Sequence, residues 1–178
     1  MVEVNLKTII TKALAMIKII DKRNITKWLT SLFVTLLLSF SIQAENLAPS
    51  QIALQAMLAQ HQGKVVYLDF WASWCVPCRR SFPWMNKMQQ QYHEQGFAVI
   101  SVNLDADESL AKDFLIRNDA SFPVIYDAKG HIAKYFKIKG MPSSMLIDRE
   151  GKIRQTHSGF FINKVKSYET EIASLLKQ

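Results

Sequence analysis

Strand-like and helix-like hydrophobic periods alternate along residues 46–178, and this alternation limits the chain to folds that pack helices against a sheet. The pattern predicts helices over 48–59, 76–95, 108–118, 128–136 and 163–176, and strands over 64–71, 97–104, 122–126, 144–148 and 153–158. We therefore expect an α/β domain with a central mixed β-sheet flanked by helices on both faces.

Composition narrows the class of protein further. Hydrophobic residues make up 49% of the 178 residues and charged residues 21%, as in one globular domain and unlike a disordered or collagen-like chain. The formal charge of +7 is uneven, because residues 1–44 carry six basic and two acidic side chains, whereas the 16 basic and 13 acidic side chains of residues 45–178 are interspersed. Because the basic residues form no cluster, we expect no nucleic-acid partner. We also expect the protein to be a monomer.

Residues 1–44 have the sequence pattern of a secretory signal peptide. Basic residues precede an apolar run over 28–42, and Ala44 is the small residue that a signal peptidase prefers. The run is 15 residues long, shorter than the roughly 20 residues that cross a bilayer as a helix. We expect cleavage near Ala44 and export of residues 45–178, with an uncleaved membrane anchor as the alternative.

Two cysteines stand three residues apart where the strand predicted over 64–71 leads into the helix predicted over 76–95. At a helix N terminus, the sulfur of Cys75 faces free backbone N–H groups and the positive end of the helix dipole, which lower the pKa of a thiol. Cys78, one turn further along, is expected to be buried and to attack a mixed disulfide formed on Cys75. The pair predicts thiol–disulfide exchange that needs no metal and no organic cofactor.

Asp69 is the third candidate catalytic residue. Counting alternate residues back along the predicted strand puts its side chain on the face beneath the helix, near Cys78. Burial raises the pKa of a carboxyl group, so Asp69 could take the proton of Cys78 when that thiol attacks. The alternative is that Asp69 faces a pocket of water and only caps a neighbouring group.

Metal and haem chemistry have little support in the sequence. A structural zinc ion needs two further ligands beside the cysteines, and the four histidines stand singly, without a metal-ligand spacing. Covalent haem attachment requires a histidine directly after the second cysteine, where this chain has Arg79. Two inert core thiols are the remaining alternative.

These residues give the sequence a strong resemblance to the thioredoxin superfamily, and more narrowly to the TlpA/ResA-like periplasmic disulfide reductases. The resemblance extends from about residue 63 to residue 159. It rests on residues 65–79 (VVYLDFWASWCVPCR), Pro83, 102–105 (VNLD), 122–124 (FPV), and 140–142 (GMP) leading into 146–153.

The resemblance implies a thioredoxin-like fold with a TlpA-type central insertion, seen as an extra helix and strand between Asp105 and Pro142. It implies that Pro142 follows a cis peptide bond and lies against the two cysteines, and that a substrate chain pairs with the backbone at Met141. Trp74, beside Cys75, is expected to shape the substrate-binding surface together with Met141 and Pro142, whereas Trp71 is expected to pack in the core.

The chain also departs from the family pattern. Ser81 stands where the family usually has a glutamate, three residues after the second cysteine, and Ser101 stands where plain thioredoxins place a lysine. A helix over 48–59 replaces the N-terminal β-hairpin common in the family. These departures affect the expected reduction potential and substrate choice rather than the fold.

The sequence thus predicts an exported thiol:disulfide oxidoreductase that acts mainly as a disulfide reductase in the periplasm. By resemblance, its partners would be protein disulfides, with apocytochrome c among the candidates, and a membrane thiol–electron donor. Two alternatives stay open: an oxidase that donates its disulfide, and a redox-inert or copper-binding module.

Overall fold

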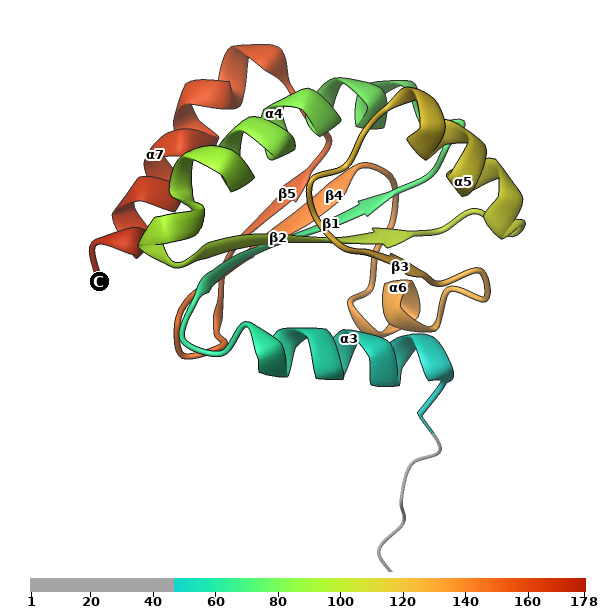
Figure 1. The fold of residues 1–178 in the computed structure, drawn as a ribbon, viewed down its shortest axis with the longest axis horizontal. Helices are drawn as coiled ribbons and strands as arrows, with labels where there is room; N and C mark the ends of the chain where they lie inside the picture. Colours follow the sequence, from blue (N-terminus) through green and yellow to red (C-terminus); the bar gives the residue numbers. More distant parts are fainter. Residues whose placement is uncertain (1–46) are drawn as a thin grey trace, which may run out of the picture. The chain divides into compact units, whose positions relative to one another are not determined.

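The computed structural model describes residues 47–178 (Figure 1), so the signal peptide expected over 1–44 lies outside the described residues. The helices are α3 (Pro49–Gln60), α4 (Val76–Tyr92), α5 (Glu108–Arg117), α6 (His131–Tyr135) and α7 (Val165–Leu176), with short 3-10 helices η1 (His93–Gln95) and η2 (Ile162–Lys164). The strands are β1 (Val65–Trp71), β2 (Phe97–Asn103), β3 (Val124–Tyr126), β4 (Ser143–Ile147) and β5 (Ile153–Ser158).

The five strands form one mixed sheet in the order β3-β2-β1-β4-β5. The pairs β1–β2 and β2–β3 are parallel, and the pairs β1–β4 and β4–β5 are antiparallel. Parallel neighbours need a crossover connection, which α4 supplies between β1 and β2, and α5 between β2 and β3. The expected mixed sheet is confirmed, with β1 at its centre.

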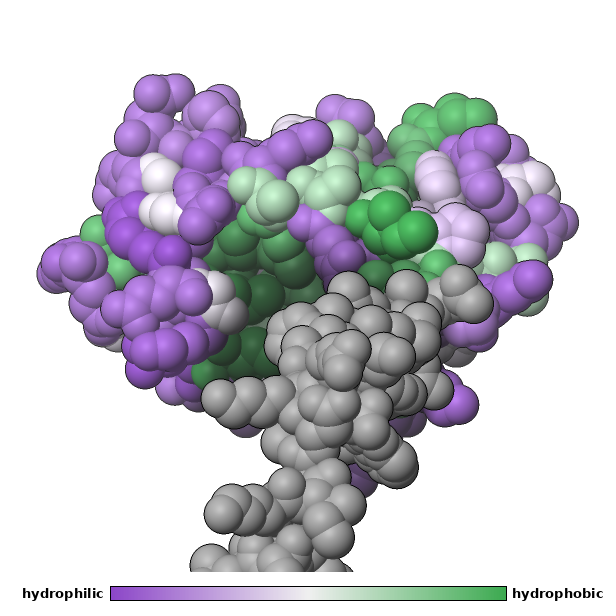
Figure 2. Space-filling model, turned by 90° about the horizontal axis from the view of Figure 1, so that it is seen from below, coloured by the Kyte–Doolittle hydropathy of each residue, from purple (hydrophilic) through white to green (hydrophobic). Residues whose placement is uncertain are grey.

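Helices cover both faces of the sheet. The odd-numbered hydrophobic residues of β1 pack in one cluster with buried residues of α4, α5 and α7, and the even-numbered ones pack in a second cluster with α3 and α6. Figure 1 shows the same division, with α4, α5 and α7 above the sheet and α3 and α6 below it. Seen from below, hydrophobic residues gather in a recessed part of the surface, next to hydrophilic residues (Figure 2).

The predicted elements are all present, and their boundaries shift for local reasons. The third strand begins at Val124 rather than at residue 122, because Pro123 lacks the N–H group that a ladder needs. The helix predicted over 128–136 is shortened to α6, since the Asp127 carboxylate accepts hydrogen bonds from the N–H groups of the residues that begin this helix, His131, Ile132 and Ala133. A carboxylate in this position fixes where a helix starts.

The segment between β2 and β4 carries the insertion that the resemblance implies. Between Asp105 and Pro142 the chain forms α5, β3 and α6. β3 extends the sheet at its edge beyond β2, and α5 and α6 pack on opposite faces. None of the helices within residues 47–178 has the length and apolar character needed to cross a membrane.

Candidate active site

The two cysteines meet at the beginning of α4. They are joined by a disulfide, and their Cα atoms lie 5.3 Å apart. Cys75 is the N-cap residue of α4, and its sulfur accepts a hydrogen bond from the backbone N–H of Cys78 at 3.3 Å. Cys75 is 4% exposed and Cys78 is fully buried. The Cys75 sulfur therefore occupies the position at a helix start where backbone N–H groups stabilise a negative charge.

A buried carboxylate holds the loop that leads to Cys75. The backbone N–H and the hydroxyl of Ser73 both donate to Asp105, each at 2.9 Å. Asn103, at the end of β2, donates its side-chain amide to the same carboxylate at 2.7 Å. Asp105 is only 2% exposed, so this loop is tied to the end of the neighbouring parallel strand through a charge-assisted network.

The cis peptide implied by the resemblance is present between Met141 and Pro142. Pro142 is buried and its carbonyl oxygen accepts a hydrogen bond from the N–H of Gly159 at 2.7 Å. Met141 is partly buried and packs against the hydrophobic cluster that contains both cysteines. The cis proline segment and the disulfide thus belong to one packed unit.

Asp69 lies on the β1 face that α4 covers, as the alternation of residues predicts. It is 1% exposed, and its Oδ2 atom has no hydrogen-bond partner among the described residues. Burial raises the pKa of this carboxyl group well above its ordinary value, because a charge without a partner is disfavoured in a dry interior. Asp69 is thus poised to hold a proton at a pH where an exposed aspartate has lost it.

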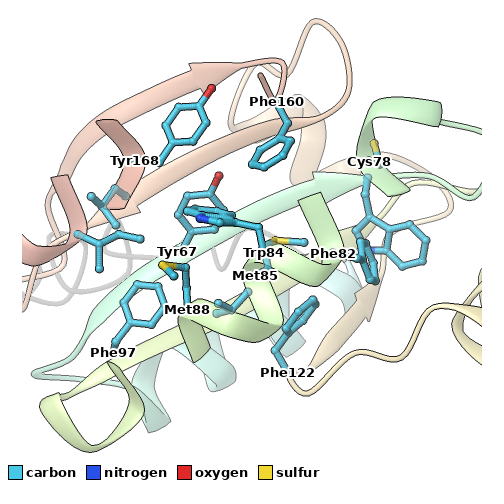
Figure 3. Close-up of a cluster of buried hydrophobic side chains, with 14 of the residues drawn as sticks. Tyr67, Cys78, Phe82, Trp84, Met85, Met88, Phe97, Phe122, Phe160 and Tyr168 are labelled. Carbon is cyan, nitrogen blue, oxygen red and sulfur yellow. The ribbon is translucent and has the colours of Figure 1, made fainter. Parts of the chain in front are cut away.

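The tryptophans divide as expected. Trp74, next to Cys75, is 64% exposed, whereas Trp71 is fully buried. Trp71 packs edge-on against Phe82 of α4, with the ring centroids 4.9 Å apart. Figure 3 shows Phe82 beside Cys78 at one end of the same buried cluster. Trp71 therefore supports the helix that carries the cysteines, while Trp74 is available at the surface.

The positions that depart from the family pattern have local hydrogen bonds. The Ser81 hydroxyl donates to the carbonyl oxygen of Cys78 at 2.8 Å. Ser101 accepts a hydrogen bond from the Trp71 indole N–H at 3.3 Å. Both serines are buried, so each satisfies its hydroxyl without bringing a charge next to the cysteines.

Sequence reasoning gave no role to Asp105 or to His157. In the sequence, Asp105 is distinguished only as a member of the VNLD motif. Its anchoring role could have been inferred from its position just after β2, because β2 pairs with β1 and β1 leads into the loop before Cys75. His157 stood as a single histidine, and its neighbours come from strand register and from α7. Within residues 47–178, no three of the side chains of His, Cys, Asp and Glu gather as a metal site.

Residues 41–172 match the family model described as Redoxin. The thiol-disulfide oxidoreductase ResA of Bacillus thuringiensis subsp. konkukian (strain 97-27) is 37% identical over 102 residues, which cover 57% of this chain and 59% of that protein. The chain therefore spans about three fifths of the length of this curated relative.

Solved structures agree with the fold. A Chlorobium tepidum protein described as a thiol:disulfide interchange protein DsbE is 50% identical, with a TM-score of 0.66, covering 67% of this chain and 84% of that one. The thioredoxin domain of a thiol-disulfide oxidoreductase from Bacteroides vulgatus is 24% identical, with a TM-score of 0.57, covering 65% and 84%. The domain thus has a thioredoxin-like fold. Because the Redoxin model matches residues 41–172, which make up most of the chain, the protein belongs to the Redoxin family.

Proposed function

We propose that this protein is an exported thiol:disulfide oxidoreductase that reduces disulfides of other proteins in the periplasm. The observation that carries the proposal is the Cys75–Cys78 disulfide at the start of α4, with the Cys75 sulfur bound to a helix N–H group. A Cys-x-x-Cys pair in this position is the usual machinery of thiol–disulfide exchange. The names of the relatives agree with this chemistry.

The reaction begins with the reduced pair. The Cys75 thiolate attacks one sulfur of a substrate disulfide, forms a mixed disulfide and releases the first substrate thiolate. Cys78 then attacks the Cys75 sulfur, so that the substrate leaves as a dithiol and the Cys75–Cys78 disulfide forms. Two electrons pass from the cysteine pair to the substrate. The disulfide of the structure is the product of this half-reaction.

Asp69 serves the second step. Cys78 is fully buried and must lose its proton to attack. Asp69 faces the same buried side of α4 and has an oxygen without a partner, so its carboxylate is the proton acceptor that this step needs. Once protonated, Asp69 is in the form that its dry surroundings favour.

The substrate chain is expected to bind at the surface formed by Trp74, Met141 and Pro142. Trp74 supplies an exposed aromatic side chain next to the attacking sulfur, and aromatic residues of this kind anchor protein interfaces. Met141, at the cis peptide, offers backbone groups for pairing with an extended chain. Oxidised apocytochrome c is one candidate substrate, and a membrane thiol–electron donor would restore the dithiol.

The direction of the reaction is the main alternative within this chemistry. A thioredoxin-like reductase has a reduction potential of about −270 mV, whereas a strong disulfide donor has a reduction potential of about −120 mV. Equilibrating residues 45–178 with glutathione buffers measures the potential directly. We expect a value near the reducing end, and a value near −120 mV would assign the protein as an oxidase.

Trapping tests the activity itself. The variant Cys78→Ala should form the mixed disulfide on Cys75 but should not resolve it. Its substrate should therefore stay bound to Cys75. The variant Cys75→Ser should neither trap substrate nor reduce insulin, and it is the matched control because it retains one thiol of the pair. Insulin reduction by Cys75→Ser at the wild-type rate would contradict the proposal that this protein is a thiol:disulfide oxidoreductase.

A further inference from the structure

A row of polar side chains crosses the hydrophobic face beneath α4 and α7. In strand register, Asp69 pairs with Ser101 on β2 and with Ser144 on β4, and Ser144 pairs with His157 on β5. Directly opposed residues of neighbouring strands project to the same face, with Cβ atoms about 4.5–5.5 Å apart. The buried carboxyl group is therefore the central member of a polar row in an otherwise apolar layer.

One end of this row reaches solvent. The Ser144 hydroxyl lies 3.4 Å from Nδ1 of His157, and Nε2 of His157 lies 2.8 Å from Oε2 of Glu171 on α7. The side chains of His157 and Glu171 are 16% and 26% exposed, in contrast to the 1% of Asp69. Hence Ser144, His157 and Glu171 form a connected path from the neighbour of Asp69 to the surface.

The hydrogen-bond roles along the path suit proton transfer. If Nε2–H donates to the Glu171 carboxylate, Nδ1 is left as an acceptor, and the Ser144 hydroxyl donates to it. Ser144 also shares a side-chain hydrogen bond with Tyr67. Because a hydroxyl oxygen has two lone pairs, one of them remains to accept a proton from the Asp69 side. Ser101, on the other side of Asp69, is already engaged with the Trp71 indole and the Pro123 carbonyl oxygen.

Few other titratable groups face this path. Tyr67 of β1 lies on the same face, and burial followed by the charge of Asp69 raises its pKa well above 10, so it stays neutral. Tyr168 of α7 packs on the His157 ring, with the centroids 4.8 Å apart. Tyr67 and Tyr168 pack in one aromatic cluster with Trp84 and Phe160 (Figure 3). From α4 and its N-cap, the titratable residues of this cluster are Cys75, Cys78 and Tyr92.

We propose that Ser144, His157 and Glu171 carry the proton of Asp69 to solvent, so that His157 and Glu171 are positioning residues for disulfide exchange. This inference rests on the function proposed above. During the attack of Cys78, which is reversible, Asp69 accepts the thiol proton and passes it on to Ser144, whose own proton moves to Nδ1 of His157, so that resolution is complete only once this transfer has occurred. The imidazolium that forms is balanced by Glu171 and loses a proton to water. No electrons move in these steps, and Asp69 returns to the carboxylate that the next cycle needs.

Resolution of the mixed disulfide is the step to measure. Reduced protein is mixed with a peptide disulfide, and release of the second peptide thiol is followed by rapid mixing between pH 5 and pH 8.5. The variant His157→Gln keeps a polar side chain but cannot carry a proton. We expect this variant to slow resolution by about tenfold to hundredfold. The upper figure is the low end of the rate acceleration that a positioned acid–base group contributes. The dependence of the wild-type rate on pH should be lost in this variant, because its side chain cannot exchange a proton with solvent.

Two further variants separate proton transfer from folding. Ser144→Ala breaks the path between Asp69 and His157, and Glu171→Gln retains an acceptor for Nε2 but removes the charge that balances an imidazolium. Both should slow resolution, while the rate at which iodoacetamide labels Cys75 stays at the wild-type value. The matched control is His93→Gln, because His93 and Glu94 form a similar pair 3.1 Å apart at an exposed position on η1. This control should match the wild type.

The outcomes distinguish the two proposals. Wild-type resolution rates and pH profiles in His157→Gln and Ser144→Ala, with Cys78→Ala still trapping substrate, would overturn the proton path and leave the enzyme proposal standing. Retained insulin reduction by Cys75→Ser would overturn both. Equal slowing by His93→Gln would also refute the path, since that histidine lies outside the row.

Discussion

Ser73 gives two hydrogen bonds to Asp105, one from its backbone N–H and one from its hydroxyl, each 2.9 Å long. Ser73 lies two residues before the attacking cysteine and Asp105 lies two residues after the end of β2. The position of Cys75 relative to the sheet is therefore fixed from the side of β2 as well as by its own strand. Asp105 is nearly inaccessible, so water cannot replace it at low cost.

Replacing Asp105 should loosen this loop and destabilise the domain. In Asp105→Ala the Ser73 N–H group and the Asn103 amide lose their acceptor, and we expect the free energy of unfolding to fall by about 2–4 kcal/mol. Ser73→Ala removes only the hydroxyl bond and should lower it by about 1–2 kcal/mol. Urea unfolding measures both values, and insulin reduction should fall in the order wild type, Ser73→Ala, Asp105→Ala.

Asp107→Ala is the matched control for this experiment. Asp107 also accepts a hydrogen bond from a backbone N–H, that of Ser109 at 2.9 Å, but it caps α5 at the surface. Loss of this exposed cap should lower the free energy of unfolding less than Asp105→Ala does and leave insulin reduction unchanged. A similar loss of activity in both aspartate variants would show that general destabilisation, rather than the loop, is responsible.

Asp69 should make the domain less stable as the pH rises. Burial raises the pKa of Asp69 in the folded state, whereas an aspartate in the unfolded chain has a pKa of about 3.9. Between these two values the folded state binds more protons than the unfolded state, so the contribution of Asp69 to stability is fully present below pH 3.9 and is lost as the pH rises through the folded pKa. Asp69→Asn carries no such dependence.

We therefore expect Asp69→Asn to be about as stable as the wild type near pH 4 and more stable by about 1–3 kcal/mol at pH 8. Urea unfolding of the disulfide form across this range measures the difference. The exposed Asp113→Asn is the control and should follow the wild type. A constant difference between Asp69→Asn and the wild type at every pH would contradict the raised pKa. In the reduced form, Asp69→Asn should also slow the resolution of mixed disulfides.

Arg149 joins three segments that are distant in the sequence. Its guanidinium donates to the carbonyl oxygens of Gly63, Gln95 and Leu176 at 2.9–3.2 Å. A Cβ atom on Gly96, whose φ is +83°, would lie 2.7 Å from the same guanidinium. The planar fork of arginine reaches several acceptors at once, which the ammonium group of lysine cannot do.

Arg149→Lys should accordingly lower the free energy of unfolding by about 1–2 kcal/mol with no change in the reduction potential, since the residue is remote from α4's first turn. Chemical denaturation and glutathione equilibration measure the two quantities. Arg117→Lys is the control, because Arg117 is exposed at the end of α5, and it should change neither. A change of the reduction potential in Arg149→Lys would indicate that the hydrogen bonds of Arg149 influence the active site.

The sequence was sufficient for the parts of the site that depend on local order. The period of β1 determines which face Asp69 occupies, and the strand-to-helix junction determines that Cys75 begins α4. The cis peptide before Pro142 came from the resemblance. Each of these features depends on neighbours within a few residues or on a motif that spans them.

Features that depend on register between distant strands could not be predicted. The row from Asp69 to His157 needs the pairing of β1 with β4 and of β4 with β5, and a shift by one residue would turn every side chain to the other face. The β4–β5 ladder contains an irregularity near Leu146 and Ile147, which periodicity alone does not reveal. Likewise, the three acceptors of Arg149 lie in segments that are far apart in the sequence and that only the fold brings together.

Trp74 offers the sharpest test of the proposed substrate surface. It is 64% exposed, so Trp74→Ala should change the free energy of unfolding by no more than about 0.5 kcal/mol. If Trp74 anchors a substrate chain, its loss should raise the KM for a protein disulfide by about tenfold, which corresponds to about 1.4 kcal/mol of binding free energy. The rate with a small disulfide such as oxidised glutathione should stay the same, because that substrate needs only the sulfur of Cys75.

Tyr135→Ala is the matched control, since Tyr135 is an aromatic residue 72% exposed on α6, on the other face of the sheet. An equal effect of the two variants on KM, or an equal effect of Trp74→Ala on both substrates, would assign the binding surface elsewhere.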